Sequence, residues 1–157
     1  MPTRDVQPGA TCAECGGGGA PGCRELFDRL LALDHSRAEP WGPLHAVAVA
    51  CYRLQHPSAL PAGDERWLLP LLRAYLDGGP EGLNHWVDGA RRASAHGHHA
   101  RPTARVAPTS GSRPRAGNPA DFETTLTDVA VNGTFPASGY RDRVRAWARA
   151  TLAAWNG

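Results

Sequence analysis

The residues of this sequence that could do chemistry are concentrated near its N-terminus, where three of its four cysteines lie. Cys12 and Cys15 are separated by two residues, which lets both sulfurs face one metal ion, and the glycine that follows permits a tight turn. A redox dithiol uses the same spacing. It normally opens a helix after a strand, whereas Gly16–Gly19 follow here. The pair therefore favours metal binding, with a redox dithiol or unused thiols as alternatives.

Two expected helices, over residues 23–34 and 43–56, indicate where further ligands would come from. Their short connection predicts an antiparallel hairpin. In such a hairpin Cys23 lies beside His56, at the end from which the cysteine pair emerges. His45 would lie about 16 Å from His56 along the second helix, too far to share an ion. Because structural zinc usually takes four Cys or His ligands, the predicted zinc ligands are Cys12, Cys15, Cys23 and His56.

Each of these residues also has a simpler interpretation. Cys23 could merely begin a helix, and His56, which precedes a proline, could merely end one. Cys51 falls on an apolar helix face and is interpreted as a core residue. His45 would become a ligand only if the hairpin had a different register.

The rest of the chain has the periodicity of helices. Further helices are expected over 64–76, with a kink or break at Pro70, and over 80–94. A short element is expected between Phe122 and Gly133, and a last helix begins with Ser138 as its cap. No strand alternation is present. The expected fold is an all-α bundle of four to five helices in a single domain, 1–157, with a Gly-rich metal-binding arm over 1–22.

The near-neutral charge of the chain argues against a dedicated nucleic-acid coat. Seventeen basic residues, all arginine, oppose fifteen acidic ones, and the absence of lysine and isoleucine suggests GC-rich codon usage. No apolar run is long enough for a membrane span, and the first residues have no apolar core of a secretory signal. We therefore expect a cytoplasmic protein.

Residues 94–120 have no apolar periodicity and are expected to form a flexible insertion. The stretch 89–120 contains six arginines and no acidic residue. Such clustering can bind phosphate, which makes anion or nucleic-acid binding an alternative. The segment offers no aromatic side chain for base stacking, so a solvated insertion is preferred and nucleic acid is not an expected partner.

Several of these motifs resemble an uncharacterised family of small bacterial proteins, common in actinobacteria. The resemblance is carried by the Cys-x-x-Cys-Gly knuckle, by LHAVAVACYRLQHP at 44–57 and by YRDRVRAWARATLAAW at 140–155. It implies that a set of polar residues matches the family pattern: Cys12, Cys15, Cys23, His45, Tyr52, Gln55 and His56. It brings no established activity.

Two functions compete on these residues. A complete set of four ligands leaves zinc no open position, which predicts a structural ion in a non-enzymatic or accessory protein. The alternative is a zinc-dependent hydrolase or lyase with an open coordination position, in which His45 or Tyr52 transfers protons. Either function is compatible with an unidentified protein or small-molecule partner. Either is also compatible with a homodimer.

Overall fold

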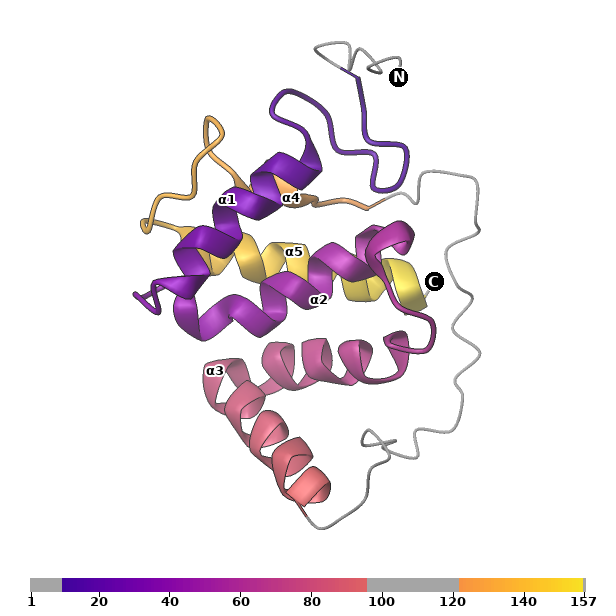
Figure 1. Cartoon of the computed structure of the whole chain (residues 1–157), viewed down its shortest axis with the longest axis vertical. Helices are drawn as coiled ribbons and strands as arrows, with labels where there is room; N and C mark the ends of the chain where they lie inside the picture. The colour runs from indigo at the N-terminus through magenta and orange to yellow at the C-terminus, as the bar shows by residue number, and fades with distance from the viewer. Residues whose placement is uncertain (1–9, 96–121, 157) are drawn as a thin grey trace.

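A computed structural model describes residues 10–95 and 122–156, and in these residues the chain is helical without a named strand (Figure 1). This confirms the predicted all-α class. The α-helices are α1 (Cys23–His35), α2 (His45–Gln55), α3 (Glu65–Ala95), α4 (Leu126–Val129) and α5 (Tyr140–Asn156). Two short 3₁₀ helices, η1 (Gly42–Leu44) and η2 (Pro57–Ala59), flank α2. No helix in these two ranges is long and apolar enough to cross a membrane.

Helix α2 forms the centre of the fold, because most of its side chains are buried. It packs against α1, α3 and α5. Prolines at both ends set its length: Pro43 lies in the preceding 3₁₀ turn, and Pro57 cannot continue the helix. Val144, Trp147 and Trp155 of α5 are buried, as predicted, and Arg141 and Arg149 are exposed, whereas Arg145 is partly buried and donates to the carbonyl of Leu76 at 2.9 Å.

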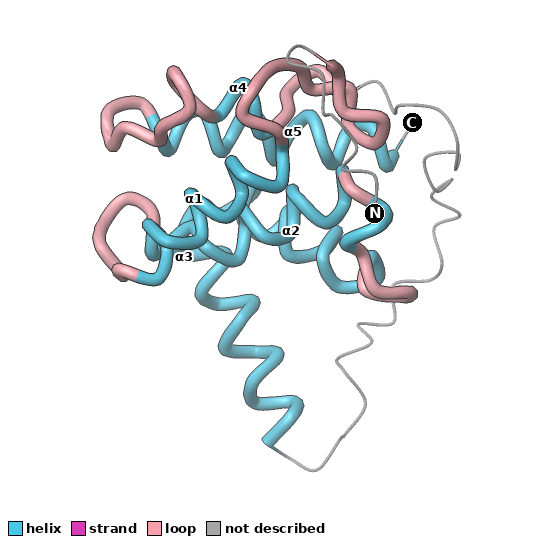
Figure 2. Tube along the Cα trace, turned by 45° about the horizontal axis from the view of Figure 1, so that its top comes forward, coloured by secondary structure: helices cyan, strands magenta, loops and turns pink. Residues whose placement is uncertain are grey.

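The kink in α3 lies at Gly79 and not at Pro70, so the prediction for Pro70 is wrong. Pro70 removes a hydrogen bond to the carbonyl of Arg66, but Arg66 is exposed and that carbonyl can turn to water. Gly79 has φ 62° and ψ −155°, a combination that essentially only glycine adopts. The residues after it form the expected separate helix, which projects away from the other helices (Figures 1 and 2).

The predictions for the remaining segments have mixed outcomes. The short element expected after Phe122 is α4, which begins with a capping box formed by Thr125 and Asp128. Gly139 directly precedes α5, so Ser138 is not its cap residue. Residues 1–9 of the arm and 96–120 of the expected insertion lie outside the described residues.

Candidate metal centre

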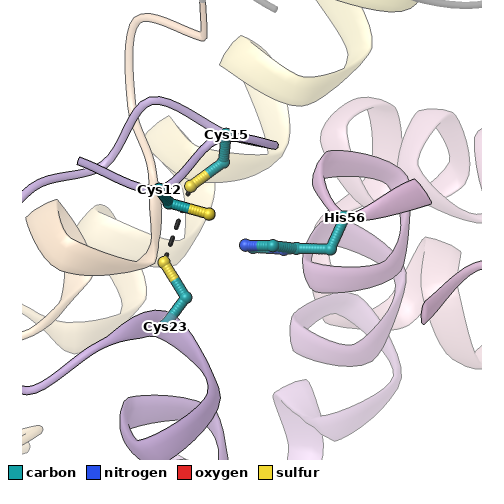
Figure 3. Close-up of side chains that lie close together, drawn as sticks. All are labelled: Cys12, Cys15, Cys23 and His56. Carbon is teal, nitrogen blue, oxygen red and sulfur yellow. Dashed lines mark hydrogen bonds between the residues drawn. The ribbon is translucent and has the colours of Figure 1, made fainter. Parts of the chain in front are cut away.

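The four residues predicted to bind zinc converge on one point between the N-terminal arm and the α1–α2 hairpin (Figure 3). One potential ligand atom from each of Cys12, Cys15, Cys23 and His56 lies within 4.8 Å of every other, close enough to hold a metal ion. The Sγ atoms of Cys15 and Cys23 are 3.6 Å apart. Tetrahedral zinc with bonds of about 2.3 Å holds two sulfurs about 3.8 Å apart. The spacing therefore suits a single tetrahedral ion.

The knuckle is held in shape by its own backbone. The N–H of Gly16 donates to the carbonyl of Cys12 at 2.8 Å, and the N–H of Cys12 donates to the carbonyl of Gly17 at 2.7 Å. Gly16 has φ 78°, which favours glycine at this point of the turn. In addition, the Gly17 N–H donates to Cys15 Sγ at 3.3 Å, the kind of bond that stabilises a thiolate ligand.

Gly17 also brings the knuckle against the beginning of α4. A Cβ atom at position 17 would lie 2.7 Å from Thr125 Oγ1, which is too close, and 3.2 Å from Cys15 Sγ, which is a tight contact. Thr125 is buried and fixed by its capping box with Asp128, so it cannot easily retreat. The absence of a side chain at Gly17 thus allows the arm to dock closely on a segment more than a hundred residues away.

His56 follows the last residue of α2 and presents one ring nitrogen to the three sulfurs. Its Nδ1–H donates to the carbonyl oxygen of Tyr52 at 2.8 Å. Its Nε2 is buried and has no hydrogen-bond partner within the described residues. A buried nitrogen without a partner is costly unless something binds it, and a metal ion is one such partner.

The ionisation of the cluster also suits metal binding. The hydrogen bond from the Cys23 thiol is the main cause that lowers the pKa of Cys15 to about 4. The same hydrogen bond and burial raise the pKa of Cys23. Burial lowers the pKa of His56, but its contacts with Cys15 and Tyr52 outweigh burial and raise it. One sulfur is therefore a thiolate at neutral pH, the form that binds metals.

A carboxylate in the middle of the knuckle ties the arm to the end of α2. The two carboxylate oxygens of Glu14 accept hydrogen bonds from the backbone N–H of Ser58, at 2.7 Å, and from its hydroxyl, at 2.9 Å. Ser58 lies two residues after His56. The arm and the hairpin are thus already aligned by a contact outside the cysteine and histidine set.

The sequence of this chain matches the model of a known protein family. The model of a family of unknown function, DUF5946, matches residues 10–156. The chain belongs to the DUF5946 family. No curated protein sequence and no solved structure matches it. The DUF5946 match extends from the arm to the end of α5, and therefore includes all four residues of the cluster.

In this DUF5946 chain, a cleft of about 740 Å³ adjoins the cluster. Cys12, Cys23 and His56 border it, whereas Cys15 does not. Tyr52 lines the cleft, and its ring stacks between those of Phe27 and His56, with centroids 3.8 Å and 4.2 Å away. Burial raises the pKa of Tyr52 to about 12, so its hydroxyl is protonated at neutral pH.

His45 lies at the opposite end of α2 from His56, about 16 Å along the helix axis. Its Nδ1 is 3.0 Å from Oδ2 of Asp34, whose side chain is fully buried. The two proton-transfer candidates therefore lie in different places, and only Tyr52 adjoins the cluster. Cys51 is buried in the core, as its position on the apolar face predicts.

Sequence reasoning did not identify Gly17, Thr125 or the Glu14–Ser58 contact as parts of this site. The position of Glu14 between the two cysteines could have indicated its contact, because a carboxylate inside the knuckle lies close to the segment against which the knuckle packs. Thr125 carries no such signal. Its role depends on a contact between segments that are distant in the sequence.

Proposed function

We propose that Cys12, Cys15, Cys23 and His56 bind one zinc ion, and that this ion has a structural role in fastening the N-terminal arm to the helical hairpin. The observation that carries the proposal is the buried, unpartnered Nε2 of His56 beside three sulfurs. Thiolate and imidazole donors in tetrahedral spacing suit zinc better than calcium, magnesium or manganese, which prefer oxygen ligands.

The arm explains why an ion would be needed there. Residues 10–22 form no helix. Only two of them are buried, Cys15 and Gly17, and glycine has no side chain. Such a segment buries too little apolar surface to offset the entropy lost on ordering. A metal ion bound by two residues of the arm and two of the hairpin supplies this missing stabilisation.

Metal analysis of protein expressed without an affinity tag tests the proposal. We expect about one zinc per chain in the wild type, and a large loss of bound zinc together with a lower melting temperature in Cys12→Ser. Cys51→Ser is the matched control, since it removes a buried thiol that does not belong to the cluster and should keep the zinc. Loss of zinc from Cys12→Ser without any change in melting temperature would contradict a structural role.

The cleft supports a second candidate function, a zinc-dependent hydrolase or lyase. In that case one of the four residues would not bind the ion, a water molecule would take the open position, and Tyr52 would donate the proton. X-ray absorption spectroscopy of the zinc protein separates the two functions. Three sulfurs and one nitrogen support the structural ion, whereas an oxygen ligand supports the enzyme.

A further inference from the structure

A second pair of titratable side chains lies at the other end of α2 from the candidate metal centre. Nδ1 of His45 is 3.0 Å from Oδ2 of Asp34. The side chain of Asp34 is fully buried, whereas that of His45 is 45% exposed. The pair joins the last turn of α1 to the first residue of α2. His45 therefore connects a buried carboxylate with the solvent.

The carboxylate of Asp34 determines which ring nitrogen of His45 carries the proton. An ionised carboxylate only accepts hydrogen bonds, so a neutral imidazole bonded to it has its proton on Nδ1. The free lone pair is then on Nε2. This atom has no hydrogen-bond partner within the described residues and, unlike Nε2 of His56, it is not buried. Asp34 thus holds the ring in the tautomer whose basic nitrogen is open to solvent.

Asp34 lowers the stability of the fold at neutral pH. Burial raises the pKa of its carboxyl group, although the hydrogen bond with His45 opposes this shift. Its Oδ1 is buried, and no group in the described part of the chain donates to it. A buried carboxylate oxygen without a donor is costly, and carboxylates shifted by burial beside a specific partner are frequent at functional sites. A role in chemistry accounts for this carboxylate better than packing does.

The surroundings of His45 indicate which reaction its free nitrogen could assist. Within the described ranges, no serine, threonine or cysteine side chain hydrogen-bonds to the ring, so the base would act on water. The ring of His35 lies nearby, with the two centroids 6.0 Å apart. The negative charge of Asp34 disfavours anionic substrates at this point. A base that activates water beside a buried carboxylate suits an uncharged ester.

We propose that His45 is the general base of a second site, separate from the metal centre, where it promotes hydrolysis of an uncharged carboxylic ester while Asp34 positions its ring. Nε2 takes a proton from water as the water oxygen forms a bond to the carbonyl carbon. The bond from that carbon to the alkoxy oxygen then breaks. The alkoxy oxygen leaves with the electron pair and takes the proton from Nε2. The products are a carboxylic acid and an alcohol, and no oxidant or reductant is required.

Steady-state hydrolysis of p-nitrophenyl acetate by the zinc-loaded full chain, at about pH 8 where an ordinary imidazole is neutral, tests the inference. His45→Gln should lower the rate about tenfold because the base is gone. Asp34→Asn should lower it about as much, because the amide can donate to Nδ1 and leave the ring proton on Nε2. His35→Gln is the matched control, since it removes the neighbouring imidazole, and it should keep the rate within about twofold. An equal loss in His35→Gln, or no loss in His45→Gln, would overturn the proposal.

Two further measurements separate positioning by Asp34 from a structural role. Urea unfolding should find Asp34→Asn at least as stable as the wild type at about pH 7, so that its lower rate does not come from unfolding. Nitrogen-15 NMR of the wild type should find the ring proton of neutral His45 on Nδ1. A rate loss that follows a matching loss of stability, or a wild-type ring proton on Nε2, would overturn the positioning role.

Chelation of the zinc separates this site from the metal centre. The part of the rate that depends on His45 should stay the same, because about 16 Å of helix lies between His45 and His56. A rate that chelation abolishes and that His45→Gln leaves unchanged would overturn the inference, and it would support the zinc-dependent enzyme in its place.

Discussion

The Nδ1–H of His56 donates to the carbonyl oxygen of Tyr52, one helical turn earlier, and this bond turns Nε2 toward three cysteine sulfurs. The acceptor belongs to the last turn of α2, where carbonyl groups lack partners within the helix. A single hydrogen bond thus satisfies the helix end, fixes the tautomer of the imidazole and aims its free nitrogen. The candidate metal centre is built on the end of α2, most of whose side chains are buried.

Replacement of His56 should distinguish a ligand from a helix terminator. His56→Ala should lose most of the bound zinc, with affinity reduced about a hundredfold or more, because one of four donors is gone. His56→Cys restores a donor and should recover much of the binding. Competition with a chromogenic chelator measures both affinities. Equal zinc affinity in the wild type and His56→Ala would show that His56 is not a ligand.

Removal of the metal should release the arm before the helices unfold. A glutamate-specific protease can cut after Glu14 in the arm and after Glu25 in α1. Chelation should raise the cleavage rate after Glu14 by about tenfold or more, because local opening becomes less costly. Cleavage after Glu25 serves as the internal control and should stay slow. Simultaneous acceleration at both sites would indicate that the ion stabilises the whole fold and not the arm alone.

Gly17 and Gly18 provide a matched pair of substitutions in the arm. A Cβ at Gly17 would clash with Thr125 Oγ1, whereas a Cβ at Gly18 meets only Thr11 Cγ2 at 3.8 Å, an ordinary contact. Gly17→Ala should therefore cost about 2 kcal/mol in the free energy of unfolding and weaken zinc binding. Gly18→Ala should change the free energy of unfolding and the zinc affinity only slightly. Urea unfolding and zinc titration measure the difference, and similar effects in both variants would contradict the close docking on α4.

The buried Asp34 should make stability depend on pH. Burial raises its pKa above the ordinary value of 3.8, although the hydrogen bond with His45 acts in the opposite direction. The folded protein therefore keeps this proton to a higher pH than the unfolded chain does. Its stability falls as pH rises from the ordinary value through the raised pKa.

Asp34→Asn removes this dependence. The gain in unfolding free energy of the variant over the wild type should be larger at about pH 7 than at about pH 4. Urea unfolding at both pH values measures it. Asp28→Asn, at an exposed position on the same helix, is the control and should show no such trend. A gain that is the same at both pH values would rule out a raised pKa for Asp34.

The sequence alone determined the helices and the identity of the four clustered residues. Apolar spacing along the chain fixes which helix face is buried, and prolines and glycines mark the ends, because these effects act within a few residues. The short connection between α1 and α2 then limits how the two helices can pair, which brings Cys23 beside His56. The knuckle spacing adds Cys12 and Cys15, so the whole cluster follows from local rules and one hairpin.

Only the tertiary structure decided how the surroundings of the cluster are arranged. Thr125 packs against Gly17 from more than a hundred residues away, and no local pattern encodes such a contact. The cleft exposes Cys12 and shields Cys15, although the knuckle makes the two cysteines look equivalent in the sequence. Tyr52 and His45 share one helix, yet only Tyr52 adjoins the cluster, since His45 lies eleven positions before His56. The solvent accessibility of a side chain and its contacts depend on how distant segments pack together. The periodicity of one segment does not specify that packing.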